Sequence, residues 1–170
     1  MKTRVLLTSL VAIVGVAGYA AGSVLATPPS MVTSTLFAVG QFHQIDARSK
    51  TDIDPSARIT WWKSLIDTSG ETDVHILENR IAPGGSFGWH SHPGPSLVVV
   101  KSGALTLYSG DDSTCTPEVI PAGSGFVDNG GDVHLVRNEG TVDTVVYVTS
   151  LVPRDAVRRI DEPSPGNCPF

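Results

Sequence analysis

From Thr35 onward the chain is divided into short apolar runs, and Gly, Pro, Asp or Asn residues separate each run from the next. Several runs are rich in Val, Ile, Thr and aromatic residues, and those at 58–61 and 104–108 alternate with the period of a half-buried strand. The runs cover residues 35–42, 57–66, 74–82, 97–100, 104–108, 126–127, 134–137 and 142–152. This many short strands with turns between them predict an all-β domain, either a sandwich or a barrel.

Little helix and only one domain are expected. No interior stretch has a sustained helical repeat, and residues 154–160 are the single short helix candidate. The predicted domain covers residues 35–152. A flexible leader is expected before it over 27–34, where Pro, Ser and Thr dominate, and a Pro-rich tail after it over 153–170.

Residues 1–26 have the pattern of an export signal. Lys2 and Arg4 precede an uncharged apolar run over residues 5–21, and the small residue Ala26 ends a cleavage pattern. We therefore expect cleavage near Ala26 and a secreted or extracytoplasmic protein. The alternative is an uncleaved N-terminal anchor helix, for which this apolar run is at the short end of what spans a bilayer.

Charge excludes some classes of partner. The whole chain has 12 basic and 17 acidic residues and a formal charge of −5; loss of Lys2 and Arg4 with the signal changes that charge to −7. An acidic domain of this kind is not a polybasic nucleic-acid binder, and it has no attraction to an anionic membrane surface. The expected partner is an unidentified small molecule, and the sequence leaves a monomer and a homodimer open.

Cys115 and Cys168 are the two cysteines of the chain. An exported protein with one pair of cysteines is expected to join them, because disulfides persist in oxidising compartments. A thiolate metal ligand or a nucleophile is disfavoured, since no His lies near Cys115 in the sequence. The predicted bridge would tie the Pro-rich tail to the domain.

Two of the five histidines, His90 and His92, are separated by one residue. Side chains two apart on a strand point to the same face, so these imidazoles project together while Ser91 faces away. Neutral imidazole is a good ligand for divalent transition metals. A His-x-His pair alone is weak evidence for a metal, because it also arises by chance.

The spacing around this pair resembles the first motif of the cupin family, in which Gly84, His90, His92 and Gly103 have the family's spacing. Members of this family are small β-barrels of the jelly-roll type. The second motif of the family is matched by Gly123, Asn129, Gly130, Gly131, His134 and Asn138. The resemblance covers residues 73–150. It implies a jelly-roll barrel that holds a divalent metal, Fe, Mn, Zn or Ni, through His90, His92 and His134.

One departure from the family pattern concerns the metal. The family usually has a Glu ligand three or four residues after the second His, where this chain has Ser96 and Leu97. The resemblance then implies either a three-His metal with open positions, as in some cupin dioxygenases, or a metal site that has been lost. Because Ser96 is short and uncharged, we expect a water between its hydroxyl and the metal.

Other polar or aromatic residues are weaker candidates. His75 shares a strand face with Leu77 and Asn79, so it is either a further base or ligand near the metal or a surface residue, and the surface position is favoured. Trp61 and Trp62 are expected to pack in the core or over the end of the barrel. His43 is expected on the surface. Three residues are candidates for lining the cavity by position alone: Glu78, Arg80 and Asp128.

Three functions remain open from the sequence. The first is an exported metal-dependent enzyme, a dioxygenase or isomerase of cupin type. The second is a non-catalytic barrel that binds a small ligand or a metal, and the third is a structural barrel. The sequence contains no phosphate-binding loop, no dinucleotide motif and no nucleophile elbow of a hydrolase.

Overall fold

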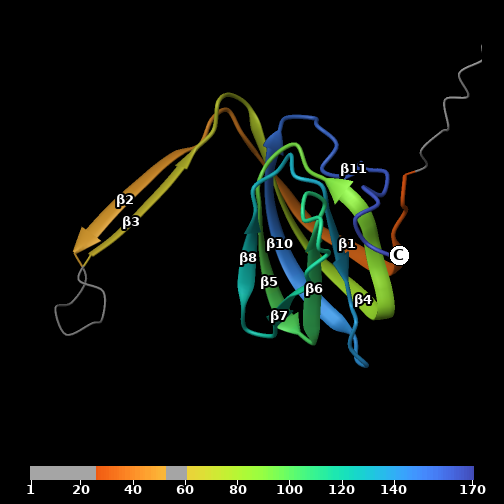
Figure 1. Cartoon of the computed structure of the whole chain (residues 1–170). Coiled ribbons are helices and arrows are strands. Elements are labelled where there is room, and N and C mark those ends of the chain that lie inside the picture. Colours follow the sequence, from red (N-terminus) through yellow and green to blue (C-terminus); the bar gives the residue numbers. More distant parts are fainter. Residues whose placement is uncertain (1–25, 53–60) are drawn as a thin grey trace, which may run out of the picture.

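The computed structural model of the protein describes residues 26–52 and 61–170 (Figure 1). These residues form strands and turns and contain no helix. One nine-stranded sheet bends into a barrel and consists of β1 (Ser30–Phe42), β4 (Thr72–Ser91), β5 (Ser96–Ser102), β6 (Ala104–Ser109), β7 (Glu118–Pro121), β8 (Gly125–Asp128), β9 (His134–Arg137), β10 (Thr144–Pro153) and β11 (Ile160–Asp161). The predicted all-β jelly-roll barrel is confirmed.

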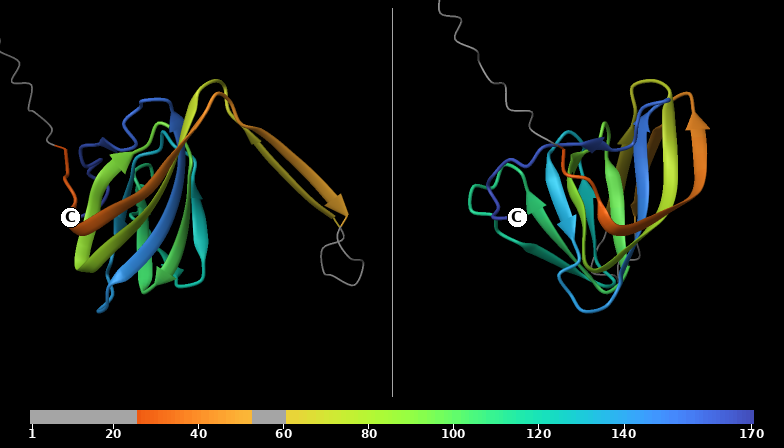
Figure 2. Two further views of the ribbon diagram at one scale, coloured as in Figure 1. Left: turned by 180° about the vertical axis from the view of Figure 1, so that it is seen from behind. Right: turned by 90° about the vertical axis from the view of Figure 1, so that its right-hand side faces the viewer.

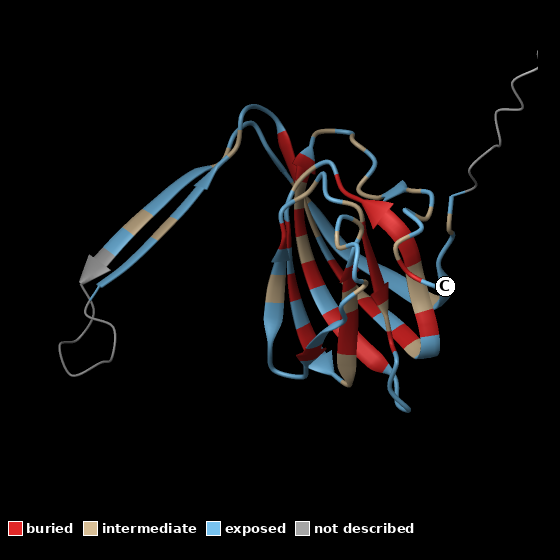
Figure 3. Cartoon of the chain, in the orientation of Figure 1, coloured by how far each residue is buried: buried red, intermediate tan, exposed pale blue. Residues whose placement is uncertain are grey.

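The barrel interior is built by alternation along the strands. On β5, Val98 and Val100 are buried while Leu97 and Val99 are exposed, which is the period of two that a strand with one face in the core requires. Figure 3 shows the same banding on β10 and on the neighbouring strands. The largest buried cluster consists of Leu77, Ile81, Val98, Val100, Leu105, Ile120, Val136, Val146 and Val148.

Strand β4 is the longest element, and it carries the apolar run at 74–82 and His90, while His92 follows its last residue. Backbone angles of φ 77° at Gly84 and 69° at Gly88 interrupt the regular extended conformation. A Cβ atom on Gly88 would overlap the carbonyl of Thr27, so glycine lets the N-terminal segment pass close to β4 here. The strand thereby reaches from the core to the end of the barrel that holds the histidines.

The chain before β1 is tied to the barrel, so the predicted flexible leader over 27–34 is wrong. The backbone amide of Trp89 donates to Oγ1 of Thr27 at 2.6 Å, and the amide of Thr27 donates to the carbonyl of Glu162 at 3.1 Å. From Ser30 the chain forms β1, which pairs with β4. The predicted signal peptide over 1–26 lies outside the described residues except for Ala26.

A hairpin of β2 (Asp46–Asp52) and β3 (Trp61–Asp67) projects away from the barrel (Figure 1). The predicted packing of two tryptophans in the core is wrong, because Trp61 and Trp62 are 58% and 49% exposed on this hairpin. Strands β2 and β7 were not expected from the sequence, since polar residues dominate β2 and β7 has only four residues. The part of the predicted run 57–66 that precedes Trp61 lies outside the described residues.

The C-terminal segment, residues 154–170, crosses one end of the barrel after β10 (Figure 2). It contains turns and the short strand β11, which pairs with Ser91 and His90 of β4, so the predicted helix over 154–160 is wrong. The predicted disulfide between Cys115 and Cys168 is present, with 5.2 Å between the Cα atoms, and it anchors the end of this segment. Across residues 26–52 and 61–170, no helix is long and apolar enough to cross a membrane.

Candidate metal centre

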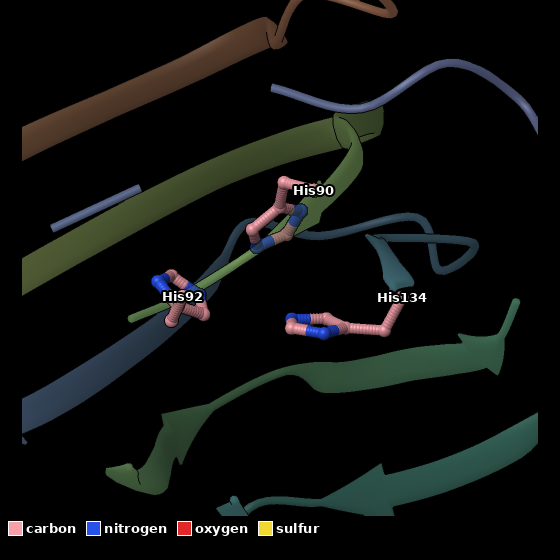
Figure 4. A group of neighbouring side chains, drawn as sticks. All are labelled: His90, His92 and His134. Atoms are coloured by element: carbon pink, nitrogen blue, oxygen red, sulfur yellow. The ribbon is translucent and has the colours of Figure 1, made fainter. Parts of the chain in front are cut away.

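The two motifs bring three histidines together at one end of the barrel. His90 lies near the end of β4 and His92 directly after it, and His134 begins β9, where it is the register partner of His90. All three side chains are buried, and one nitrogen of each ring lies within 4.8 Å of the others. Figure 4 shows the rings gathered around a common space between the strands.

Backbone carbonyls set the orientation of all three rings. Nδ1 of His90 lies 2.9 Å from the carbonyl of Gly88, Nδ1 of His92 lies 2.6 Å from that of Arg158, and Nδ1 of His134 lies 3.0 Å from that of Asp132. A carbonyl only accepts, so each Nδ1 carries the proton and donates it. In a neutral ring this leaves the lone pair on Nε2, which is the arrangement that a metal-binding histidine needs.

Burial keeps the rings of His90 and His92 neutral. It lowers the pKa of His90 from 6.5 to about 2, with His134 and the positive charge of Arg159 adding to the effect. Burial also lowers the pKa of His92, although the carbonyl of Arg158 and the carboxylate of Asp128 act in the opposite direction. Around neutral pH these two imidazoles therefore present lone pairs and carry no charge.

Asp128, at the end of β8, adds a carboxylate to this group. Its Oδ2 lies 3.3 Å from Nε2 of His92 and 3.8 Å from Nε2 of His134. Oδ1 accepts a hydrogen bond from the amide of Gly130 at 3.0 Å, but the buried Oδ2 has no hydrogen-bond partner among the described residues. Lone pairs of two imidazoles and of a carboxylate thus face one another with no donor between them.

This donor set fits a divalent cation. Facing lone pairs repel, and a buried carboxylate oxygen without a partner is costly, so a positively charged species would stabilise this arrangement. Three imidazoles and one carboxylate are common ligands of Zn, Fe and Mn. Nitrogens bound to one ion at about 2.1 Å lie roughly 3–4 Å apart, so small side-chain rotations suffice to bring the histidines to binding distance.

The family profile described as a cupin domain matches residues 77–150, which include both histidine motifs. This part of the chain is a cupin domain. No curated protein matches this cupin.

Solved structures with a similar fold include proteins of different described functions. An uncharacterised protein with a double-stranded β-helix domain from Klebsiella pneumoniae is 19% identical over 71% of this chain and 85% of that chain, with a TM-score of 0.44. An oxalate oxidase in complex with glycolate is 28% identical over 45% of this chain, with a TM-score of 0.40. A polyketide cyclase from Streptomyces resistomycificus is 20% identical over 54% of this chain and 64% of that chain, with a TM-score of 0.45. The matched part spans only 41% of the oxalate oxidase.

The sheet places another carboxylate beside the position where the family usually has the glutamate of the first motif. Ser96 on β5 is the register partner of Asp128 on β8, so the two side chains share the inner face of the barrel as neighbours. Ser96 is buried, and its hydroxyl lies 2.8 Å from that of Ser150. A carboxylate is therefore present beside position 96, on the paired strand instead of on β5.

The remaining candidates lie elsewhere. His75 is half-buried on β4 and is neither in the histidine group nor among the residues that line the cavity. His43 is exposed, as predicted, with Nδ1 3.2 Å from the carboxylate of Glu71. Glu78 and Arg80 point outward, toward Lys101 and Asp143 respectively.

A cavity of about 50 Å³ adjoins the histidines. Its wall is apolar on the core side, where Val98, Leu105 and Val146 contribute, and polar at the end where the histidines lie. The C-terminal segment adds Arg158 and Arg159 to the lining. These arginines were not predicted from the sequence, because the path of the tail over the barrel is set by β11 and the disulfide.

Proposed function

We propose that this cupin binds one divalent metal ion through His90, His92, His134 and Asp128, and that a small molecule binds beside the ion in the cavity. The observation that carries the proposal is the convergence of Nε2 lone pairs and the partnerless Oδ2 of Asp128 on one buried space. A divalent ion bound there would supply Lewis acidity and, as iron or manganese, redox chemistry.

The protein's own groups orient the ligands and limit access. The carbonyls of Gly88, Arg158 and Asp132 hold the protons on Nδ1 of the histidines, and the amide of Gly130 fixes the carboxylate of Asp128. The apolar wall of the cavity excludes bulk water from the bound small molecule. An ion held by these four side chains would be able to accept a further ligand from the small molecule.

We further propose that the reaction is an oxidation of the small molecule, with a dioxygenase as the most specific form. The alternative is a barrel that binds a ligand without catalysis. An oxygen-consumption screen of the iron-loaded and manganese-loaded protein against small organic compounds separates the two. Consumption that requires both metal and compound supports the enzyme, and binding without turnover supports the alternative.

Export is also proposed. The disulfide between Cys115 and Cys168 is compatible with an extracytoplasmic location, because such bonds rarely persist in a reducing cytosol. Amino-terminal sequencing of protein recovered from outside the cytoplasm is expected to begin at or near Thr27. A sequence that begins at Met1 would support the anchor helix instead.

Metal stoichiometry tests the central part of the proposal. Elemental analysis after incubation with Zn²⁺ and gel filtration is expected to find one ion per chain in the native protein. His134→Gln should retain little metal, whereas His43→Gln, which removes an exposed imidazole outside the cavity, should retain the full amount. Equal retention by both variants would contradict the proposed ligands.

A further inference from the structure

Two adjacent arginines, Arg158 and Arg159, line the same cavity as the three histidines. Both are half-buried and lie in the C-terminal segment directly before β11. The proposed metal explains why three histidines and Asp128 line the cavity, but it does not explain these two guanidinium groups. Their charges therefore need a separate explanation.

Arg158 is connected to the metal centre through its backbone and is one of the residues that line the cavity. Its carbonyl accepts the hydrogen bond from Nδ1 of His92 at 2.6 Å, which fixes this residue relative to β4. Its guanidinium has no hydrogen bond or ion pair with any residue in the described part of the chain, and burial lowers its pKa. A half-buried cation without a counter-ion has an unbalanced charge that an anionic ligand can pair with.

Two nitrogens of the Arg159 guanidinium are engaged with the protein, and the third is not. Its Nε donates to Oδ1 of Asp161 at 2.6 Å, and its Nη2 donates to the carbonyl of Phe87 at 2.6 Å. The guanidinium carbon also lies 5.9 Å from the centre of the Phe87 ring. Nη1 is buried and has no partner among residues 26–52 and 61–170. Nη1 is thus pre-organised and loses little entropy when it donates to an acceptor.

The charges of the cavity favour an anion. Among its described lining residues Asp128 is the only acid, and it faces the histidines. Asp161 offsets Arg159 from outside the cavity, and the guanidinium of Arg158 has no such counter-charge. A divalent ion at the histidines would increase the excess of positive charge. Guanidinium groups bind the two oxygens of a carboxylate through paired, charge-assisted hydrogen bonds.

We propose that the guanidinium of Arg158 and Nη1 of Arg159 form a binding site for the carboxylate group of a small ligand. This inference rests on the proposed function only in that it names the class of small molecule bound beside the metal. A cavity of about 50 Å³ admits a group of only a few non-hydrogen atoms. The ligand is therefore a short carboxylic acid, or a larger molecule that inserts its carboxylate.

Titration with acetate, followed by NMR chemical shifts, tests the site on the zinc-loaded and on the metal-free protein. Acetamide serves as the uncharged match to acetate. Arg158→Gln keeps the backbone carbonyl that orients His92, and Arg80→Gln removes one exposed positive charge outside the cavity as the control. We expect acetate to bind about tenfold to a hundredfold more weakly to Arg158→Gln than to the native protein and to Arg80→Gln.

Each outcome decides a separate point. The carboxylate site would be overturned if acetate bound equally well to the native protein and to a correctly folded Arg158→Gln. It would also be overturned if acetamide bound as tightly as acetate. Either result would leave the proposed metal centre intact. Failure to retain zinc would overturn the proposed metal centre, and the same comparison on the metal-free protein then decides the arginine site. Thermal unfolding of Arg158→Gln checks that the variant folds.

Discussion

Asp128 has an unusual environment for a carboxylate: it is buried against two imidazole nitrogens, and no group in the described part of the chain donates to its Oδ2. If that oxygen binds the metal, Asp128→Asn removes the only anionic ligand while keeping the shape of the side chain. Metal affinity should then fall roughly 100-fold, as measured by competition with a chromophoric chelator. Asp132→Asn removes an exposed carboxylate nearby and should keep the native affinity.

A carboxylate exchange provides a second control for Asp128. Because Ser96 and Asp128 are register partners, a carboxylate on either strand can reach the same face. Asp128→Ser should bind metal weakly, and adding Ser96→Glu to it should recover most of the lost affinity. If the double variant binds no better than Asp128→Ser, position 96 does not face the metal.

The buried histidines also make the stability of the metal-free protein depend on pH. The folded-state pKa of His90 is lowered from 6.5 to about 2, so between these values the unfolded chain binds a proton that the folded chain does not. This contribution to stability is fully present above pH 6.5 and decreases as the pH falls. For one such histidine the loss is about 1.4 kcal/mol between pH 7.5 and pH 5.5.

Urea unfolding of the metal-free protein at these two pH values measures this effect. His90→Gln should show a decrease in the free energy of unfolding that is smaller than in the native protein by about 1 kcal/mol. Identical decreases in the two proteins would mean that His90 titrates normally in the folded state.

The C-terminal segment is the element that couples the surface of the barrel to the metal centre. It provides the carbonyl that orients His92, the strand that pairs with His90, and both cavity arginines. The disulfide at Cys168 closes a loop of 53 residues, which stabilises the folded state by about 4 kcal/mol on the chain-entropy estimate.

Replacing Cys115 and Cys168 by Ser should therefore lower both stability and metal affinity. We expect a lower melting temperature in thermal unfolding and faster loss of zinc to a chelator, with the barrel still folded. Addition of a reductant to the native protein should reproduce both changes, and it should have no effect on the double variant. If the double variant lost zinc at the same rate as the native protein, the C-terminal segment would keep its position without the disulfide.

The elements differed in how well the sequence predicted them. Strands with an alternating apolar pattern, such as β5 and β10, are predictable because burial on one face imposes that pattern. The histidines are predictable because each motif is local. Asp128 is separated from His92 by 36 positions and meets it only through the pairing of strands, so a local motif cannot identify it. The acidic residue at the end of the apolar run 126–127 was the one available signal.

At the scale of the whole molecule, the chain divides into a barrel with its C-terminal segment and a projecting hairpin (Figure 2). Strands β2 and β3 pair only with each other among the described strands, and several apolar side chains on them are exposed: Trp61, Trp62, Leu65 and Ile66. The hairpin contributes nothing to the lining of the histidine cavity. The barrel should therefore fold and bind metal without it.

Replacement of residues 47–66 by Asn-Gly tests this division, because Asp46 and Asp67 are register partners that a two-residue turn can connect. We expect a melting temperature within about 5 °C of the native value and an unchanged zinc stoichiometry. Loss of folding would contradict the independence of the barrel. Light scattering on both proteins also reports whether the exposed apolar hairpin holds two copies together in a homodimer.

The central claim is that one ion is bound by His90, His92, His134 and Asp128, and anomalous diffraction from crystals of the zinc-loaded protein tests it most directly. The account predicts a single strong peak at the zinc edge, about 2.0–2.2 Å from Nε2 of each histidine and from Oδ2 of Asp128. A cavity without a peak, or a peak bound by other residues, would contradict it.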